Sequence, residues 1–345
     1  MSTQDGGLTE RPGGAPTGST SGVASQVPTT RPGGKRLEPQ PVNLVLEGGG
    51  VKGIGLVGAI SVLEERGFSF VRVAGTSAGA IVGSLVAARF TGAELQELMA
   101  PLDYTKFRDA SGWERALPFT KLLDVGIHRG IYKGEYFHQW IADQLASKGK
   151  HTFADLPVAP EPGVPEAQQY KLVVMASDVS QGRLVRLPWD FADPAHPRDA
   201  QPIADAVRAS MSIPFFYRPF QLNVFPDGPS VMVDGGMLSN FPIDAFDRPA
   251  GAPPGPPTIG IKLSARRRAD FVRYRAEGDL GLALAMLGTM QSWSDQMHLD
   301  QPRVIDDTIF VDTMGVNATD FEIKKPVQDR LYQNGRSAAE KWLDG

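Results

Sequence analysis

Apolar positions along the chain follow two different periods, and their alternation predicts a β/α architecture. Short apolar runs bounded by glycine or polar residues predict strands at 42–46 and 70–74. Between them, residues 54–66 carry apolar side chains at the spacing of one helix face, with Gly67 as a stop. Residues 78–90 predict a second, more apolar helix. A strand–helix–strand–helix order of this kind predicts a βαβ unit with parallel strands.

The same periodicity continues to the C-terminus. It predicts helices at 91–100, 135–147, 203–210, 281–296 and 325–343, and strands at 170–176, 230–233 and 258–263. Residues 178–188 predict a hairpin arm that turns at Gln181 and Gly182. We therefore expect one α/β domain with a mainly parallel sheet at 41–345. Residues 1–40, rich in Gly, Pro, Ser and Thr, predict a disordered tail, because they hold too little apolar surface to become ordered.

Composition excludes several classes of function. The 345 residues are 41% hydrophobic and 21% charged, as in a soluble globular protein, and the net charge of −4 gives no argument for a nucleic-acid partner. The absence of cysteine excludes disulfides, thiol nucleophiles and thiolate metal sites. Neither a signal peptide nor an apolar run long enough to span a membrane is found. We expect a cytoplasmic protein without metal or cofactor, and peripheral membrane contact stays open.

The most informative motif is the pentapeptide at 75–79, Gly-Thr-Ser-Ala-Gly. Its G-x-S-x-G form places a serine on a sharp turn between a strand and a helix, and both flanking elements are predicted here. The start of the following helix would direct free N–H groups and the positive end of its dipole toward this serine. Ser77 is therefore a candidate nucleophile that still needs a base and an oxyanion site.

A glycine loop at 48–53, Gly-Gly-Gly-Val-Lys-Gly, admits several interpretations. Gly48, Gly50 and Gly53 match a dinucleotide-binding fingerprint after a strand. That site needs an acidic residue at the end of the next strand, which instead runs into Thr76 with no carboxylate. A P-loop needs a lysine followed by Ser or Thr, and here glycine follows the lysine.

The same loop also suits an oxyanion hole. Three consecutive glycines allow backbone N–H groups to converge on one point without obstruction by side chains. In a βαβ unit this loop and the Ser77 turn lie at the same edge of adjacent strands, so that donors and hydroxyl would face each other. A tight turn without a ligand remains the alternative.

Two acidic or basic groups compete for the role of base. In the chain order of an α/β-hydrolase, only His298 could follow Asp234, and it lies near the end of a predicted helix instead of on a loop after a strand. Asp234 ends an apolar strand and opens a Gly-Gly turn, where a carboxylate can approach another group closely. The alternative for Asp234 is a turn aspartate that bonds its own backbone.

Taken in order, the motifs resemble those of the patatin-like phospholipase family. The resemblance covers about residues 42–345 and rests on the strand and glycine loop at 43–53, the motif at 75–79 and Asp-Gly-Gly at 234–236, with further similar stretches at 176–184, 209–214 and 239–242. It implies a three-layer α/β sandwich with a mainly parallel central sheet. The family often has arginine where this chain has Lys52, so a bidentate fork contact is lost there.

The resemblance also implies a mechanism. Ser77 would be the nucleophile and Asp234 the base of a dyad that needs no histidine, and Gly49, Gly50 and the amide of Val51 would form the oxyanion hole. The implied activity is that of a lipid acyl hydrolase of phospholipase A or lysophospholipase type, acting through an acyl-enzyme on phospholipid or lysophospholipid. A nucleotide-binding protein, a Ser-Asp-His hydrolase and a non-catalytic scaffold are the competing hypotheses.

Overall fold

The protein is represented by a computed structural model, which describes residues 39–109, 132–264, 282, 285, 286, 288–290 and 302–345. Apart from its last two positions, the predicted tail at 1–40 lies outside the described residues. Most of the predicted helix at 281–296 and the candidate base His298 also lie outside them.

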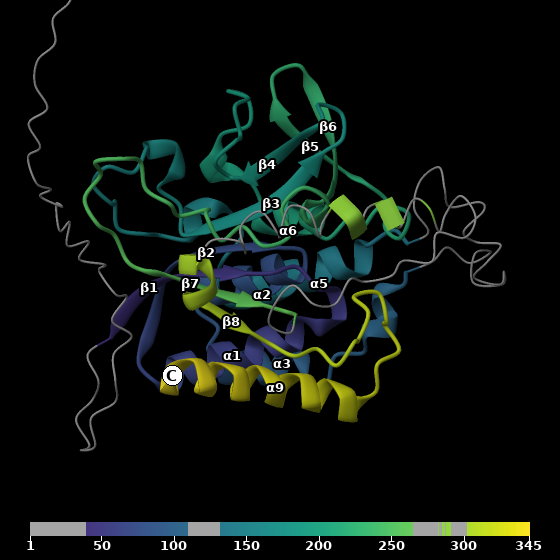
Figure 1. The fold of residues 1–345 in the computed structure, drawn as a ribbon. Coiled ribbons are helices and arrows are strands. Elements are labelled where there is room, and N and C mark those ends of the chain that lie inside the picture. Colours follow the sequence, from purple (N-terminus) through teal and green to yellow (C-terminus); the bar gives the residue numbers. More distant parts are fainter. Residues whose placement is uncertain (1–38, 110–131, 265–281, 283–284, 287, 291–301) are drawn as a thin grey trace, which may run out of the picture. The chain divides into compact units, whose positions relative to one another are not determined.

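A mixed β-sheet forms the centre of the described structure (Figure 1). Its strand order is β5-β6-β3-β2-β1-β7-β8, and β4 pairs with β3 off this path. The pairs β1–β2, β2–β3, β1–β7 and β7–β8 are parallel, whereas β4, β5 and β6 pair antiparallel. The predicted mixed α/β fold with a mainly parallel sheet is thus confirmed. The strands are β1 Gln40–Leu46, β2 Phe68–Thr76, β3 Leu172–Asp178, β4 Arg183–Leu187, β5 Phe220–Phe225, β6 Gly228–Asp234, β7 Thr258–Lys262 and β8 Thr308–Phe310.

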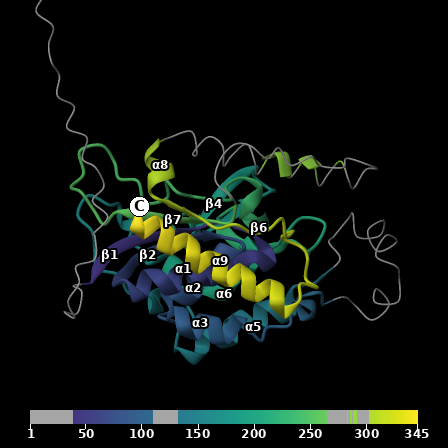
Figure 2. The ribbon, with the colours of Figure 1, turned by 60° about the horizontal axis from the view of Figure 1, so that its bottom comes forward.

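Successive side chains of each strand point to opposite faces of the sheet. Both faces carry apolar side chains and are buried. Leu44 and Leu46 belong to one apolar cluster, whereas Val45 belongs to the other. Helices cover the first face, and α9 packs along α1 there (Figure 2). Trp189 and residues 241–246 cover the second face, together with α8. The helices are α1 Ile54–Glu65, α2 Ala78–Ala87, α3 Gly92–Met99, α5 Glu135–Ser147, α6 Ile203–Ser210, α8 Pro302–Asp306 and α9 Lys325–Asp344.

Local sequence signals set several of these boundaries. Thr91 and Glu94 form a reciprocal capping box at the start of α3. Gly67 takes the left-handed conformation that ends α1, with φ of +89°. The predicted hairpin arm is confirmed as β3 and β4, which turn at Gly182. Strands β5 and β8 were not expected from the periodicity, because both are short and one face of β5 is exposed.

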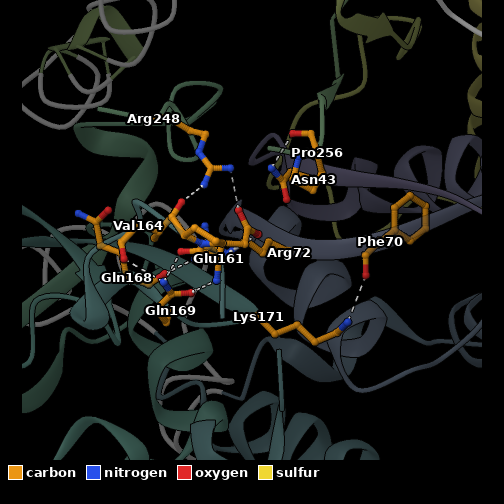
Figure 3. A network of polar contacts seen from close by, with 11 residues as sticks. Asn43, Phe70, Arg72, Glu161, Val164, Gln168, Gln169, Lys171, Arg248 and Pro256 are labelled. Atoms are coloured by element: carbon orange, nitrogen blue, oxygen red, sulfur yellow. Dashed lines mark hydrogen bonds and ion pairs between the residues drawn. The ribbon is translucent and has the colours of Figure 1, made fainter. Parts of the chain in front are cut away.

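A polar network ties two long loops to the middle of β1 and β2 (Figure 3). Glu161 pairs with Arg72 of β2 at 3.5 Å and with Arg248 at 3.3 Å. On β1, the Asn43 side chain donates to the Pro256 carbonyl at 3.2 Å. Arg72, Glu161 and Arg248 are largely buried, so removal of the Glu161 carboxylate would leave both arginines without this counterion. This network stabilises the sheet at a distance from the strand ends that carry the candidate site.

Candidate active site

Ser77 occupies a strained turn between β2 and α2. Its backbone has φ of 52° and ψ of −117°, a region that L-residues with side chains rarely adopt and that costs about 1–3 kcal/mol. The flanking glycines make this turn possible. A Cβ on Gly75 would lie 2.3 Å from the Gly79 carbonyl oxygen, and one on Gly79 would lie 2.2 Å from the Leu46 carbonyl oxygen. Close packing at the ends of β1 and β2 therefore requires glycine at both positions of the motif.

Strand register explains how Asp234 reaches this turn. Met175 of β3 pairs with Thr76, the last residue of β2, and the next residue, Ala176, pairs with Asp234, the last residue of β6. Strand β4 pairs with residues 174–178 of β3, a stretch that includes residues paired with β2 and residues paired with β6. Because one edge of β3 cannot pair with two strands at the same residues, β4 lies along the opposite edge. Strands β2 and β6 must then share one edge of β3 and run toward each other. Their ends meet where Ser77 leaves the sheet.

The structure brings together the two side chains that the sequence singles out. The Ser77 hydroxyl lies close enough to the Asp234 carboxylate to lower its pKa, and Asp234 is 3% exposed. The Gly236 N–H donates to Asp234 Oδ1, at 2.7 Å. Burial raises the pKa of Asp234 to about 6, and the Ser77 hydroxyl and the Gly236 N–H offset part of that rise. Asp234 is thus mostly ionised at neutral pH and is a stronger base than a free carboxylate.

The glycine loop packs directly against the serine. A Cβ on Gly48 would lie 3.3 Å from Ser77 Cβ. Several N–H groups of the loop donate within the protein: that of Gly48 to the Asn240 carbonyl oxygen at 3.0 Å, that of Val51 to the Ala318 carbonyl oxygen at 3.1 Å, and that of Lys52 to the Gly49 carbonyl oxygen at 3.2 Å. Within the part of the chain that the structure describes, the N–H groups of Gly49 and Gly50 donate to no backbone acceptor.

Buried charged side chains lie next to the glycine loop. Glu47 forms an ion pair with Lys262, and each side chain is 5% exposed. Asn240 Nδ2 donates to Glu47 Oε1 at 3.3 Å, so the turn after β6 is tied to the end of β1. Burial lowers the pKa of Lys52, although the Glu47 carboxylate counteracts this effect. The loop is thereby fixed to the sheet by charged hydrogen bonds instead of by apolar packing alone.

Of the three described histidines, His138 and His196 each bond an acidic side chain, and His151 is exposed. His138 contacts Asp205 at 2.7 Å and His196 contacts Asp193 at 2.8 Å. Among residues 39–109, 132–264 and 302–345, no group of three or more His, Cys, Asp or Glu side chains could hold a metal ion. No helix within the described ranges is both long enough and apolar enough to cross a membrane.

Three residues that contact the site were not predicted from the sequence. Ser210 accepts a hydrogen bond from the Ser77 N–H at 2.9 Å, and Asn240 and Ala318 bond the glycine loop. Ser210 and Asn240 lie in stretches that carry the family resemblance, so their motifs were visible while their contacts were not. Nothing in the local sequence marks Ala318, because its contribution is a backbone carbonyl.

Fold, motifs and comparison with known proteins agree on the class of protein. Residues 44–247 match the family model described as patatin-like phospholipase. The chain belongs to the patatin-like phospholipase family, which implies a lipid substrate.

Several relatives have similar sequences or folds. The uncharacterized protein YqhO of Bacillus subtilis (strain 168) is 36% identical over 299 residues, which cover 87% of this chain and 97% of YqhO. The lysophospholipase NTE1 of Chaetomium globosum is 37% identical over 104 residues, 29% of this chain and 7% of that protein. The crystal structure of VipD from Legionella pneumophila is 19% identical, with a TM-score of 0.49, over 89% of this chain and 67% of VipD.

Proposed function

We propose that this protein is a lipid acyl hydrolase that cleaves carboxylic ester bonds with a dyad of Ser77 and Asp234. The observation that carries the proposal is the placement of Ser77, on a strained turn, beside a buried carboxylate whose pKa is raised to about 6. A serine on such a turn, next to a base of near-neutral pKa, is the arrangement that nucleophilic catalysis needs. The family and its lysophospholipase members support an ester of a lipid as substrate.

The first step forms an acyl-enzyme. Ser77 Oγ attacks the ester carbonyl carbon while Asp234 takes the hydroxyl proton, and the carbonyl oxygen becomes an oxyanion. As the tetrahedral intermediate collapses, the bond to the alcohol breaks and Asp234 returns the proton to the leaving oxygen. In the second step Asp234 removes a proton from water, whose oxygen attacks the acyl carbon. The bond between that carbon and Ser77 Oγ then breaks, the fatty acid leaves, and Asp234 returns the proton to Ser77 Oγ.

The glycine loop supplies the oxyanion site in this proposal. Gly48 packs against Ser77, and the N–H groups of the next two residues, Gly49 and Gly50, donate to no backbone acceptor among the described residues. The Val51 N–H donates to the Ala318 carbonyl oxygen, so the substrate oxygen would replace that carbonyl to gain a third donor. Fixed backbone donors of this kind stabilise developing negative charge without reorganisation.

The finer substrate class follows from the relatives. We propose a phospholipid or lysophospholipid as substrate, because distant relatives are described as lysophospholipases. We also propose that residues 41–345 form the catalytic domain, since the described elements from β1 to α9 frame the site.

Lipid hydrolysis by the purified chain tests the proposal. Phosphatidylcholine vesicles, lysophosphatidylcholine micelles and a chromogenic acyl ester are offered separately, and released fatty acid or chromophore is measured. Wild-type protein should hydrolyse at least one of them, and Ser77→Ala and Asp234→Ala should each lose at least about a thousandfold in rate while remaining folded. Full activity in either variant would refute the dyad.

A further inference from the structure

A buried serine interrupts the β2–β3 ladder at the nucleophile. Earlier in this parallel ladder the Val73 N–H donates to the Lys171 carbonyl oxygen at 2.7 Å. Four residues further along each strand, the same register would direct the Ser77 N–H to the Met175 carbonyl oxygen. Instead, the Ser77 N–H donates to Ser210 Oγ at 2.9 Å, and the Ser210 hydroxyl donates to the Met175 carbonyl oxygen at 2.6 Å. Ser210 thus occupies the place of a ladder hydrogen bond.

The inserted hydroxyl satisfies both backbone groups that the interrupted ladder would leave unpaired. Ser210 is fully buried, so no water replaces it without a rearrangement. With its N–H held by a side chain instead of by the neighbouring strand, Ser77 can leave the plane of the sheet and take its φ of 52°. That backbone conformation directs the Ser77 side chain to Asp234.

The same turn also holds the partner carboxylate. Two residues after Ser210, the Ser212 carbonyl oxygen accepts the Asp234 N–H at 2.9 Å. The Ser212 hydroxyl is fixed in turn by Arg208 Nη1, at 2.6 Å, and the Arg208 residue is 2% exposed. One short segment at the end of α6 therefore contacts the backbones of both dyad residues.

We propose that Ser210 is a positioning residue whose hydroxyl, inserted between the Ser77 N–H and the Met175 carbonyl, sets the geometry of the nucleophile. The inference rests on the proposed role of Ser77 in ester hydrolysis. Without the hydroxyl, the Ser77 N–H is expected to close onto the Met175 carbonyl as the ladder continues, which draws the Ser77 side chain away from Asp234. A misplacement of about 1 Å in a catalytic group can cost about a hundredfold in rate.

Ser210→Ala tests this role against a matched control. Ser84→Ala removes a buried hydroxyl from α2, the helix that follows Ser77, where Ser84 Oγ bonds only the Ile81 carbonyl among the described residues. For a chromogenic ester we expect kcat per fluorophosphonate-labelled site to fall about 10- to 100-fold in Ser210→Ala, with KM within about twofold of wild type. Ser84→Ala should retain wild-type kcat. Unchanged kcat per labelled site in Ser210→Ala would overturn the proposal.

Crystal structures of the wild type and Ser210→Ala give a readout that does not need activity. Loss of the contact between Ser77 and Asp234 in the variant supports the proposal, and an unchanged Ser77 backbone with that contact intact overturns it. If Ser210→Ala does not fold, Ser210→Cys decides by the same two measurements, because a thiol keeps the shape but is a weak acceptor. If wild-type protein hydrolyses no ester, the proposed function fails, and the structures still decide the role of Ser210.

Discussion

Ser77 and Asp234 meet because the two strands that carry them end head to head along the same edge of β3. Neither strand alone forms the proposed dyad. The parallel strand β2 delivers the serine, the antiparallel strand β6 delivers the carboxylate, and β3 fixes the register between them. This arrangement buries the carboxylate, at 3% exposure, beside the Ser77 hydroxyl.

The rate of ester hydrolysis should depend on the ionisation of Asp234. Burial raises the pKa of Asp234 to about 6, and only the ionised carboxylate can accept the Ser77 proton. We expect kcat/KM to be constant above about pH 7 and to fall about tenfold per pH unit below pH 6. Initial rates of hydrolysis of a soluble acyl ester, measured between pH 4.5 and 8.5, give this profile. A rate that stays constant from pH 5 to pH 8 would contradict the assignment.

Stability should respond to pH in the opposite direction through the same group. The pKa of Asp234 is raised from 3.8 to about 6 on folding, so the folded state binds the proton more tightly and gains stability as pH falls from about 6 toward 4. Asp234→Asn lacks this titrating carboxyl group. The free energy of unfolding of the variant minus that of the wild type should therefore decrease by about 2 kcal/mol between pH 8 and pH 4.5. Urea titrations at both values measure the difference, which would be independent of pH if Asp234 had an ordinary pKa.

Glu47→Gln should destabilise the fold strongly. The change replaces the carboxylate of a buried ion pair by a neutral amide and leaves the Lys262 ammonium buried beside it. We expect a loss of about 3–5 kcal/mol in the free energy of unfolding. Glu65→Gln is the matched control, because Glu65 pairs with Arg336 on the surface and is 56% exposed, and it should cost at most about 1 kcal/mol. Equal losses of unfolding free energy in the two variants would show that burial of the Glu47–Lys262 ion pair does not contribute to stability.

Gly50→Ala should damage the glycine loop. Gly50 has φ of +54°, and an added Cβ would lie 1.9 Å from the Ala318 carbonyl oxygen, so the backbone must shift. Gly182→Ala carries the same kind of strain, with φ of +65°, but its Cβ would meet nothing within 4 Å. We expect Gly182→Ala to cost about 1 kcal/mol with full activity, and Gly50→Ala to cost more and to lose at least about tenfold in kcat. Thermal unfolding and ester hydrolysis, measured in parallel, separate the two effects.

Sequence patterns predicted those parts of the fold that depend on local order. The helices at 135–147 and 203–210 have the predicted bounds in the structure, because an apolar face and a following breaker fix each of them. The turn at Ser77 was predicted for the same reason, since the glycines at 75 and 79 are needed wherever such a turn is made.

Relations between distant segments could not be predicted from the sequence. Asp234 ends an apolar strand in the sequence, but nothing local shows that this strand runs antiparallel and meets the end of β2. Ser210 is one of many serines until the register of β2 and β3 shows that it replaces a ladder bond. The Ala318 carbonyl has no side-chain signature at all. Long-range backbone geometry decides each of these contacts.

Covalent labelling of Ser77 by a fluorophosphonate tests the central claim most directly. The probe reacts with an activated serine hydroxyl and needs no knowledge of the lipid substrate. We predict that wild-type protein is labelled at one serine, that peptide mapping identifies it as Ser77, and that labelling is abolished in Ser77→Ala and slowed at least about a hundredfold in Asp234→Asn. Absence of labelling in folded wild-type protein, or undiminished labelling in Asp234→Asn, would contradict the account.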